Sequence, residues 1–227
     1  MLHRLTELLF PRKCVFCRKL LKTDETDLCA HCRQNAPVFA KGKFKLSFIA
    51  RWTAVWYYED TVRQSILRYK FGSRRSYAPF YGRQLAMKLQ TCGMDAFDVL
   101  TYVPISRLRK WKRRFDQMEL VAEQVGHELG VPVTCALRKV RHNKPQSTLK
   151  SAAQRRANAL NAYRVLNPEA IRGKRVLLLD DILTTGATAN ECARTLLTAG
   201  ASEVTFAAIA VANHNEKKQA SYPEAAM

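Results

Sequence analysis

The segment at residues 176–188 constrains the fold of this 227-residue chain more than any other part of the sequence. It reads Val-Leu-Leu-Leu-Asp-Asp-Ile-Leu-Thr-Thr-Gly-Ala-Thr, which is an apolar run, an acidic pair and a turn rich in threonine and glycine. Residues 189–197 then have the pattern of a helix that stops before Gly200, and a second apolar run follows at 204–211. Continuous apolar runs are typical of parallel strands that are buried on both faces. The segment therefore predicts a strand–helix–strand unit within a parallel α/β sheet.

The residues at the end of the first apolar run are suited to binding a sugar phosphate. In open parallel sheets, ligands bind beyond the carboxyl ends of the strands, and a turn that enters a helix offers backbone N–H groups to a phosphate. Adjacent carboxylates can accept hydrogen bonds from a ribose diol and can lie near a divalent cation. The candidate binding residues are Asp180, Asp181, Thr184, Thr185, Gly186, Ala187 and Thr188.

Two other classes of nucleotide-binding motif are excluded, because the stretch contains neither Gly-Lys-Ser/Thr nor Gly-x-Gly-x-x-Gly. A structural role, in which the acidic pair caps a turn and the threonines fill a loop, is the weaker alternative, since strand, loop and helix are all predicted in order. The stretch resembles the signature of type I phosphoribosyltransferases. That resemblance implies that it binds the ribose and the 5-phosphate of phosphoribosyl pyrophosphate (PRPP).

Four of the seven cysteines form two Cys-x-x-Cys pairs that are eleven residues apart: Cys14, Cys17, Cys29 and Cys32. Four thiolates in this spacing are typical of a tetrahedral structural zinc site. Residues 12–40 contain few large apolar side chains, so this segment needs a metal to fold. A thioredoxin-like redox pair is the rival interpretation, but that motif needs only one pair inside a βαβ pattern.

The remaining cysteines, Cys92, Cys135 and Cys192, are expected to be small buried or half-buried core residues, and His31 is expected to face solvent. An odd number of cysteines is poor material for a secreted disulfide framework. The sequence also has no run near the roughly 18 apolar residues of a membrane span and no signal-peptide pattern. These features predict a cytoplasmic protein.

Basic residues are concentrated in one region. The formal net charge is +19, which indicates polyanionic partners, and six of the eight residues at 107–114 are Arg or Lys. We expect a basic loop that binds pyrophosphate or single-stranded nucleic acid, with Trp111 as a stacking residue. The alternative is a solvated basic surface with Trp111 packed underneath. The residues of this loop are Pro104, Ile105, Ser106, Arg107, Arg109, Lys110, Trp111, Lys112 and Arg113.

Hydrophobic periodicity predicts the other elements. They are a short N-terminal helix before Pro11, strands at 52–58, 99–103 and 131–137, helices at 62–69, 81–89 and 118–129, and a long functional loop at 138–161. The predicted organisation is a zinc module and linker at 1–45, a phosphoribosyltransferase-like domain at 46–213 and a disordered tail at 214–227.

With these parts in order, the chain resembles the ComF/GntX family, whose members combine cysteine knuckles with a phosphoribosyltransferase-like domain and are associated with natural competence and DNA utilisation. Residues 103–106 and 113–117 are similar to the family's Val-Pro-x-x and Arg-Gly-Phe-Asn-Gln, with Arg114 in place of glycine and Asp116 in place of asparagine. Gln146, Leu149, Arg155 and Asn158 match its Gln-x-x-Leu and Arg-x-x-Asn pattern. The resemblance implies that Arg155 contacts phosphate.

Three functional hypotheses follow. A ComF-type protein of DNA uptake (natural transformation) would bind single-stranded DNA and PRPP with Mg²⁺, carry structural Zn²⁺ and have other DNA-uptake proteins as partners; the +19 charge favours it. A salvage phosphoribosyltransferase enzyme that releases pyrophosphate would need a base-recognition hood, yet the tail after Val211 is short and polar. A zinc-knuckle binding protein with a decayed enzyme fold would not require the acidic pair and residues 184–188 to stay together.

Overall fold

The computed structural model describes residues 11–40, 42, 46–72, 74–94, 96–141 and 151–213. The predicted N-terminal helix, the tail at 214–227, Gln146 and Leu149 lie outside this part of the chain, as does most of the predicted linker. Among the described helices, none combines the length and the apolar character that crossing a bilayer requires.

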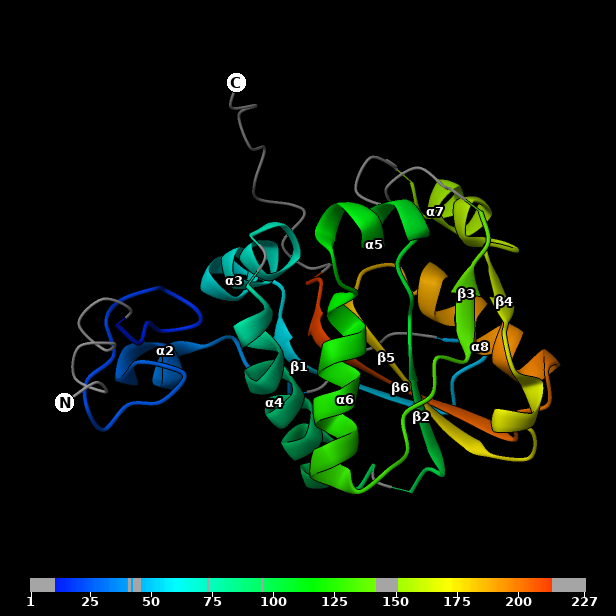
Figure 1. Ribbon diagram of the computed structural model, residues 1–227, viewed down its shortest axis with the longest axis horizontal. Coiled ribbons are helices and arrows are strands. Elements are labelled where there is room, and N and C mark those ends of the chain that lie inside the picture. Colours follow the sequence, from blue (N-terminus) through cyan, green and yellow to red (C-terminus); the bar gives the residue numbers. More distant parts are fainter. Residues whose placement is uncertain are drawn as a thin grey trace.

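A four-stranded parallel sheet forms the centre of the molecule (Figure 1). Its strands are β1 (Arg51–Tyr57), β2 (Val99–Tyr102), β5 (Arg175–Leu183) and β6 (Glu203–Val211), in the order β1-β6-β5-β2. The two apolar runs become the two central strands, β5 and β6, whose residues contribute to the cores on both faces of the sheet. The predicted parallel α/β sheet and its strand–helix–strand unit are therefore confirmed.

Helices cover both faces of the sheet (Figure 1). The helices α3 (Asp60–Phe71), α4 (Ala78–Thr91) and α6 (Gln117–Leu129) share one core with Leu177 and Leu179. On the other face, α8 (Ala187–Thr198) shares a core with Val176 and Leu178. Helix α7 (Ala152–Ala159) packs against α8. Strand β4 (Tyr163–Val165) also contacts α8, and it pairs antiparallel with β3 (Leu137–Lys139). Short 3₁₀ turns lie at Arg75–Tyr77 and Pro168–Ala170.

The predicted basic loop is in fact a helix, α5 (Arg107–Arg113). Its N-cap is Ser106, whose Oγ accepts a hydrogen bond from the backbone N–H of Arg109 at 3.4 Å. Arg, Lys and Leu are strong helix formers, and a serine at the N-cap satisfies one of the free N–H groups of the first turn. The prediction of a loop was wrong. Helices were predicted from the spacing of apolar residues, and this helix has charged residues on every side.

Two further predictions along the chain need correction. Residues 131–137 do not form a regular strand: Val133 makes an isolated bridge to Leu100, and β3 begins only at Leu137. The predicted long loop at 138–161 contains part of β3 and the whole of α7. Cys135 is exposed rather than buried, whereas Cys92 is half-buried and Cys192 is buried as expected. Weak periodicity was a poor guide here because these elements are short.

The cysteine module packs directly against the domain. The side chain of Phe16 is 0% exposed, and its ring makes edge contacts with Trp56 on β1 at 5.2 Å and with Phe80 on α4 at 5.6 Å, measured between ring centroids. Ser65 and Arg68 on α3 donate hydrogen bonds to the backbone carbonyl of Val15. The core of the module is therefore continuous with the core of the sheet, so the two parts support each other.

Candidate functional site

The acidic pair lies at the carboxyl end of the sheet, at the point where one neighbouring strand has ended. Strand β2 pairs with β5 as far as Tyr102 opposite Leu179, whereas β6 pairs with β5 up to Val211 opposite Leu183. Asp180 and Asp181 therefore belong to β5 itself, and not to the loop after it. Because successive strand residues point to opposite faces, the two carboxylates lie on opposite faces of the sheet at its carboxyl end.

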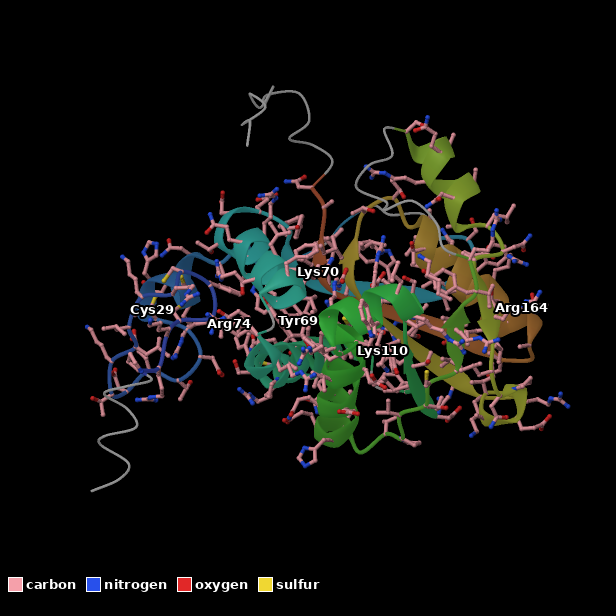
Figure 2. All side chains as sticks on the ribbon, turned by 45° about the horizontal axis from the view of Figure 1, so that its top comes forward. Cys29, Tyr69, Lys70, Arg74, Lys110 and Arg164 are labelled. Carbon is pink, nitrogen blue, oxygen red and sulfur yellow. The ribbon has the colours of Figure 1, made fainter. Side chains whose placement is uncertain are left out.

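The Asp181 carboxylate is held by a cation from α3. The Nζ atom of Lys70 lies 2.9 Å from Oδ2 of Asp181, and their side chains are only 17% and 19% exposed. Figure 2 shows Lys70 on α3 and Lys110 on α5 at the same end of the sheet. Sequence reasoning missed Lys70, because a lysine in the last turn of a helix carries no signal of a distant ion partner.

The Asp180 carboxylate faces α8 and the β3–β4 pair. Its Oδ1 accepts a hydrogen bond from the backbone N–H of Asp181 at 2.8 Å. Burial raises the pKa of Asp180 well above its usual value, and the negative charge of Asp181 raises it further. Its negative charge favours the protonated forms of Lys139 and Tyr163. A cation bound between the two carboxylates would offset this unfavourable charge and favour the ionised form of Asp180.

The predicted phosphate loop connects β5 to α8. Gly186 is the N-cap of α8 and has a φ of +73°, a left-handed conformation that only glycine adopts without strain. Its carbonyl accepts the first helical hydrogen bond, from the backbone N–H of Asn190 at 2.8 Å. The N–H groups of the first helical turn and the positive end of the helix dipole lie beyond it. The structure therefore has the strand, turn and helix start that an anion site requires.

Helix α5 has two different faces. Arg109 and Arg113, four residues apart, are partly buried: the charge of Arg113 interacts with Asp181, and that of Arg109 with Lys139. We call these two the inner face. The outer face surrounds an open cavity of about 760 Å³ and consists of Arg107, Lys110, Trp111 and Arg114.

Trp111 is 78% exposed, so the alternative in which it packs beneath the basic cluster is wrong. Lys112 lies in the same helix. Pro104 is buried and Ile105 is half-buried in the connection from β2 to α5. The residues that were predicted as one basic loop thus lie on two faces of a helix. The inner face lies towards the acidic end of β5, and the outer face lies towards solvent.

The two departures from the family pattern have clear places in the structure. Arg114 has a φ of +62°, the backbone conformation that the family's glycine would adopt most easily. Asp116 is 2% exposed and accepts hydrogen bonds from the backbone N–H groups of Ile105 at 3.0 Å and Met118 at 3.1 Å. These bonds go to different carboxylate oxygens, so an asparagine, which has one side-chain oxygen, could accept only one of them in this geometry. This side chain fixes the residues before α5 against the start of α6.

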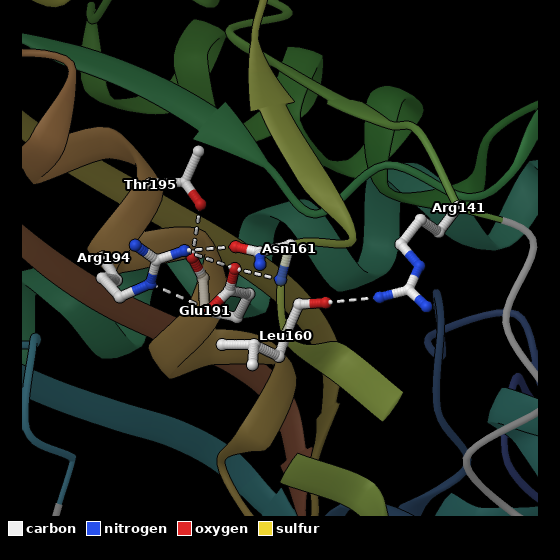
Figure 3. Close-up of polar contacts among 6 residues, drawn as sticks. All are labelled: Arg141, Leu160, Asn161, Glu191, Arg194 and Thr195. Atoms are coloured by element: carbon white, nitrogen blue, oxygen red, sulfur yellow. Dashed lines mark hydrogen bonds and ion pairs between the residues drawn. The ribbon is translucent and has the colours of Figure 1, made fainter. Parts of the chain in front are cut away.

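Arg155 lies in α7, which packs on α8. Its contact with a sugar phosphate stays a prediction. The end of α7 is tied to α8 by Glu191 (Figure 3). The Glu191 carboxylate is buried and accepts hydrogen bonds from the backbone N–H of Asn161 at 2.7 Å and from the Arg194 guanidinium. The helix that begins at the phosphate loop therefore also positions the segment that carries Arg155.

The four paired cysteines converge on one point. The sulfur atoms of Cys14, Cys17, Cys29 and Cys32 all lie within 4.8 Å of one another, and those of Cys17 and Cys29 are 3.6 Å apart. A tetrahedral zinc ion with Zn–S bonds of about 2.3 Å would separate its sulfurs by about 3.8 Å. His31 is exposed and lies next to Asn35, outside this set. The donor set fits structural zinc, as predicted.

Comparison with known proteins identifies both parts of the chain. A phosphoribosyl transferase domain model matches residues 119–225, and a double zinc ribbon domain model matches residues 5–44. Competence protein F of Haemophilus influenzae is 26% identical over 222 residues, which cover 86% of this chain and 95% of that protein. DNA utilization protein YhgH of Escherichia coli O157:H7 is 28% identical over 209 residues, covering 84% and 86%. Competence protein ComFC of Bacillus subtilis is 26% identical over 196 residues, covering 82% and 78%.

Proposed function

The chain belongs to the family of Competence protein F, ComFC and YhgH, and on this premise we propose that it serves DNA uptake or DNA utilisation by binding single-stranded DNA and Mg²⁺-PRPP. The observation that carries the proposal is the meeting of three groups at the carboxyl end of β5. These are the acidic pair, the N-terminus of α8 and the inner face of α5.

Each group suits one part of PRPP. The carboxylates of Asp180 and Asp181 would accept hydrogen bonds from the ribose hydroxyls, and as hard oxygen ligands they suit the accompanying Mg²⁺. The turn at 184–188 would bind the 5-phosphate through backbone N–H groups and threonine hydroxyls. The inner arginines would neutralise the pyrophosphate, for which a planar guanidinium is well shaped.

The outer face of α5 is the proposed contact for DNA. It combines three cationic side chains with an exposed indole around one open cavity. Single strands are bound without sequence preference when cations follow the phosphates and aromatic rings stack on the bases. The net charge of +19 favours such a polyanion over a neutral partner.

Phosphoribosyl transfer is the second candidate, and the position of the inner arginines favours it. In that reaction a nucleobase nitrogen forms a bond to C1 of the ribose as the bond from C1 to pyrophosphate breaks, and Arg109 and Arg113 would stabilise the charge that develops on the leaving pyrophosphate. Release of pyrophosphate in the presence of a nucleobase would support transfer. Binding of PRPP without release of pyrophosphate would support binding but not transfer.

The outer face of α5 is expected to contribute to DNA binding and not to PRPP binding. Arg107→Ala with Lys110→Ala should weaken single-stranded DNA binding and lower the slope of log K against log salt by about 1.4, since each phosphate contact on a single strand contributes about 0.7. PRPP binding should be unchanged. Arg109→Ala with Arg113→Ala should weaken PRPP binding at least about tenfold. Fluorescence titration for DNA and calorimetry for PRPP measure the two affinities.

Charge alone is controlled for by Arg172→Ala with Lys174→Ala, which removes two positive charges just before the start of β5, at the opposite end of the sheet. This variant should leave both affinities close to those of the wild type. Equal losses of DNA binding in the outer-face variant and in this control would contradict a DNA site on α5.

A further inference from the structure

A second exposed aromatic side chain, Phe71, lies close to the acidic pair. Phe71 is the last residue of α3 and is 70% exposed. It directly follows Lys70, whose Nζ is 2.9 Å from the Asp181 carboxylate. A single exposed apolar residue needs no explanation by itself, but this one follows the ion-paired Lys70 and contacts a charged side chain of α5.

Phe71 is not isolated, because a guanidinium from α5 lies against its ring. The Cζ atom of Arg113 is 4.8 Å from the centroid of the Phe71 ring, within the range of a cation–π contact. Arg113 is an inner-face residue whose charge also interacts with Asp181. The ring and the guanidinium therefore connect the end of α3 to the part of α5 that faces the acidic strand end.

The end of α3 is also held in place by α6. The Tyr69 hydroxyl donates a hydrogen bond to the carbonyl of Gln117 at 2.7 Å, and the Gln117 side-chain amide donates to the carbonyl of Lys70 at 3.3 Å. Tyr69 is fully buried. Phe71 thus follows a fixed point of the fold, and the ring is positioned by its neighbours despite its exposure.

Such a pair has a definite ligand chemistry. A ring that is 70% exposed still offers π surface to a flat partner, and an arginine beside it adds a cation that favours aromatic or anionic groups. Base stacking on an aromatic side chain contributes about 1–3 kcal/mol per base. Lys70 is paired with Asp181, so the cation that lies against the ring is Arg113, and its charge favours an anionic partner over an apolar protein surface.

We propose that Phe71 and Arg113 form a base-stacking subsite, which holds one nucleobase of a single strand next to Asp181 while the phosphates of that strand follow the outer face of α5. The subsite rests on the proposed binding of single-stranded DNA and adds a residue from a different helix to it. It gives the site a preference for strands with bases over a bare sugar–phosphate chain.

The test compares two strands of equal charge, a dT 12-mer and a 12-mer in which every base is replaced by hydrogen. Phe71→Ala is expected to lower the affinity for dT by about 5- to 150-fold, the equivalent of 1–3 kcal/mol. It should leave the affinity for the abasic strand unchanged. Phe71→Trp should keep the dT affinity. Met87→Ala, at an exposed apolar residue of α4, is the control and should bind both strands as the wild type does.

The possible outcomes separate this inference from the broader proposal. If the wild type binds dT but Phe71→Ala binds it equally well, the stacking subsite is wrong and DNA binding stands. If Phe71→Ala weakens both strands to the same extent, Phe71 acts on the structure of α3 and the subsite is again wrong. If the wild type binds neither strand, the proposed DNA function fails, and the subsite fails with it.

Discussion

Replacing Cys14 and Cys32 by serine is expected to abolish zinc binding and to destabilise the whole molecule. In small zinc modules, the free energy of metal binding, about 10–16 kcal/mol, is the free energy of folding. The residues described for this module include few large buried side chains. One of them, Phe16, is buried mainly by contacts with Trp56 and Phe80 of the neighbouring domain. Loss of the metal should therefore expose these aromatic rings and lower the stability of the sheet on which they pack.

Zinc content by elemental analysis should fall from one ion per chain to none, and the near-ultraviolet circular dichroism of the aromatic cluster should diminish. The midpoint of thermal unfolding should fall as well. Cys135→Ser is the matched control, because Cys135 is an exposed cysteine outside the four-sulfur cluster. A double variant that keeps the wild-type melting temperature without zinc would show that the metal does not support the fold.

Replacing Asp180 and Asp181 by asparagine is expected to abolish the binding of Mg²⁺-PRPP while the chain still folds. Removing one charged partner from a largely buried hydrogen-bonded pair commonly costs about 2–5 kcal/mol of binding free energy. The combined loss should therefore exceed about 100-fold. Asparagine keeps the size of each side chain but offers neither the negative charge nor the second carboxylate oxygen that Mg²⁺ prefers.

Calorimetry with PRPP and Mg²⁺ measures this loss, and circular dichroism checks the fold. Asp98→Asn is the matched control, because Asp98 pairs with Arg175 at the opposite end of β5, at 2.7 Å. The control should bind as the wild type does. Wild-type affinity in the Asp180 and Asp181 double variant would contradict the assignment of the site, and absence of binding by the wild type would overturn the PRPP proposal altogether.

A pH dependence distinguishes Asp180 from an ordinary surface acid. Its pKa in the folded chain is raised above the unfolded value of about 3.9 by burial and by Asp181. The folded state therefore binds more protons than the unfolded state, and rising pH costs stability, by at most about 1.4 kcal/mol per pH unit for one proton. Asp180→Asn should be more stable than the wild type near neutral pH.

Thermal unfolding between pH 5 and pH 8, without added Mg²⁺, measures this difference. The advantage of Asp180→Asn should widen as pH rises, until the pH passes the raised pKa of Asp180 in the folded chain. Comparing the variant with the wild type at each pH cancels the titration of the groups that do not interact with Asp180. A constant difference across the range would contradict a raised pKa.

Features that depend on neighbouring residues in the sequence could be predicted. Continuous apolar runs predicted β5 and β6, because a strand that is covered on both faces must be apolar throughout. The spacing of the cysteine pairs predicted their convergence on one metal site, since such knuckles are closed by local turns. The glycine at 186 predicted a turn, and its φ of +73° supplies the reason.

Features that depend on residues far apart in the sequence were decided only by the tertiary structure. The ion pair of Lys70 with Asp181 exists because the packing of α3 brings its last turn to the end of β5. The contact of Phe71 with Arg113 exists because the packing of α3 and α5 brings the last residues of the two helices together. Local patterns determine which segments become strands, helices and metal knuckles. The burial of their apolar faces then determines which charges meet, and that meeting produces the candidate site.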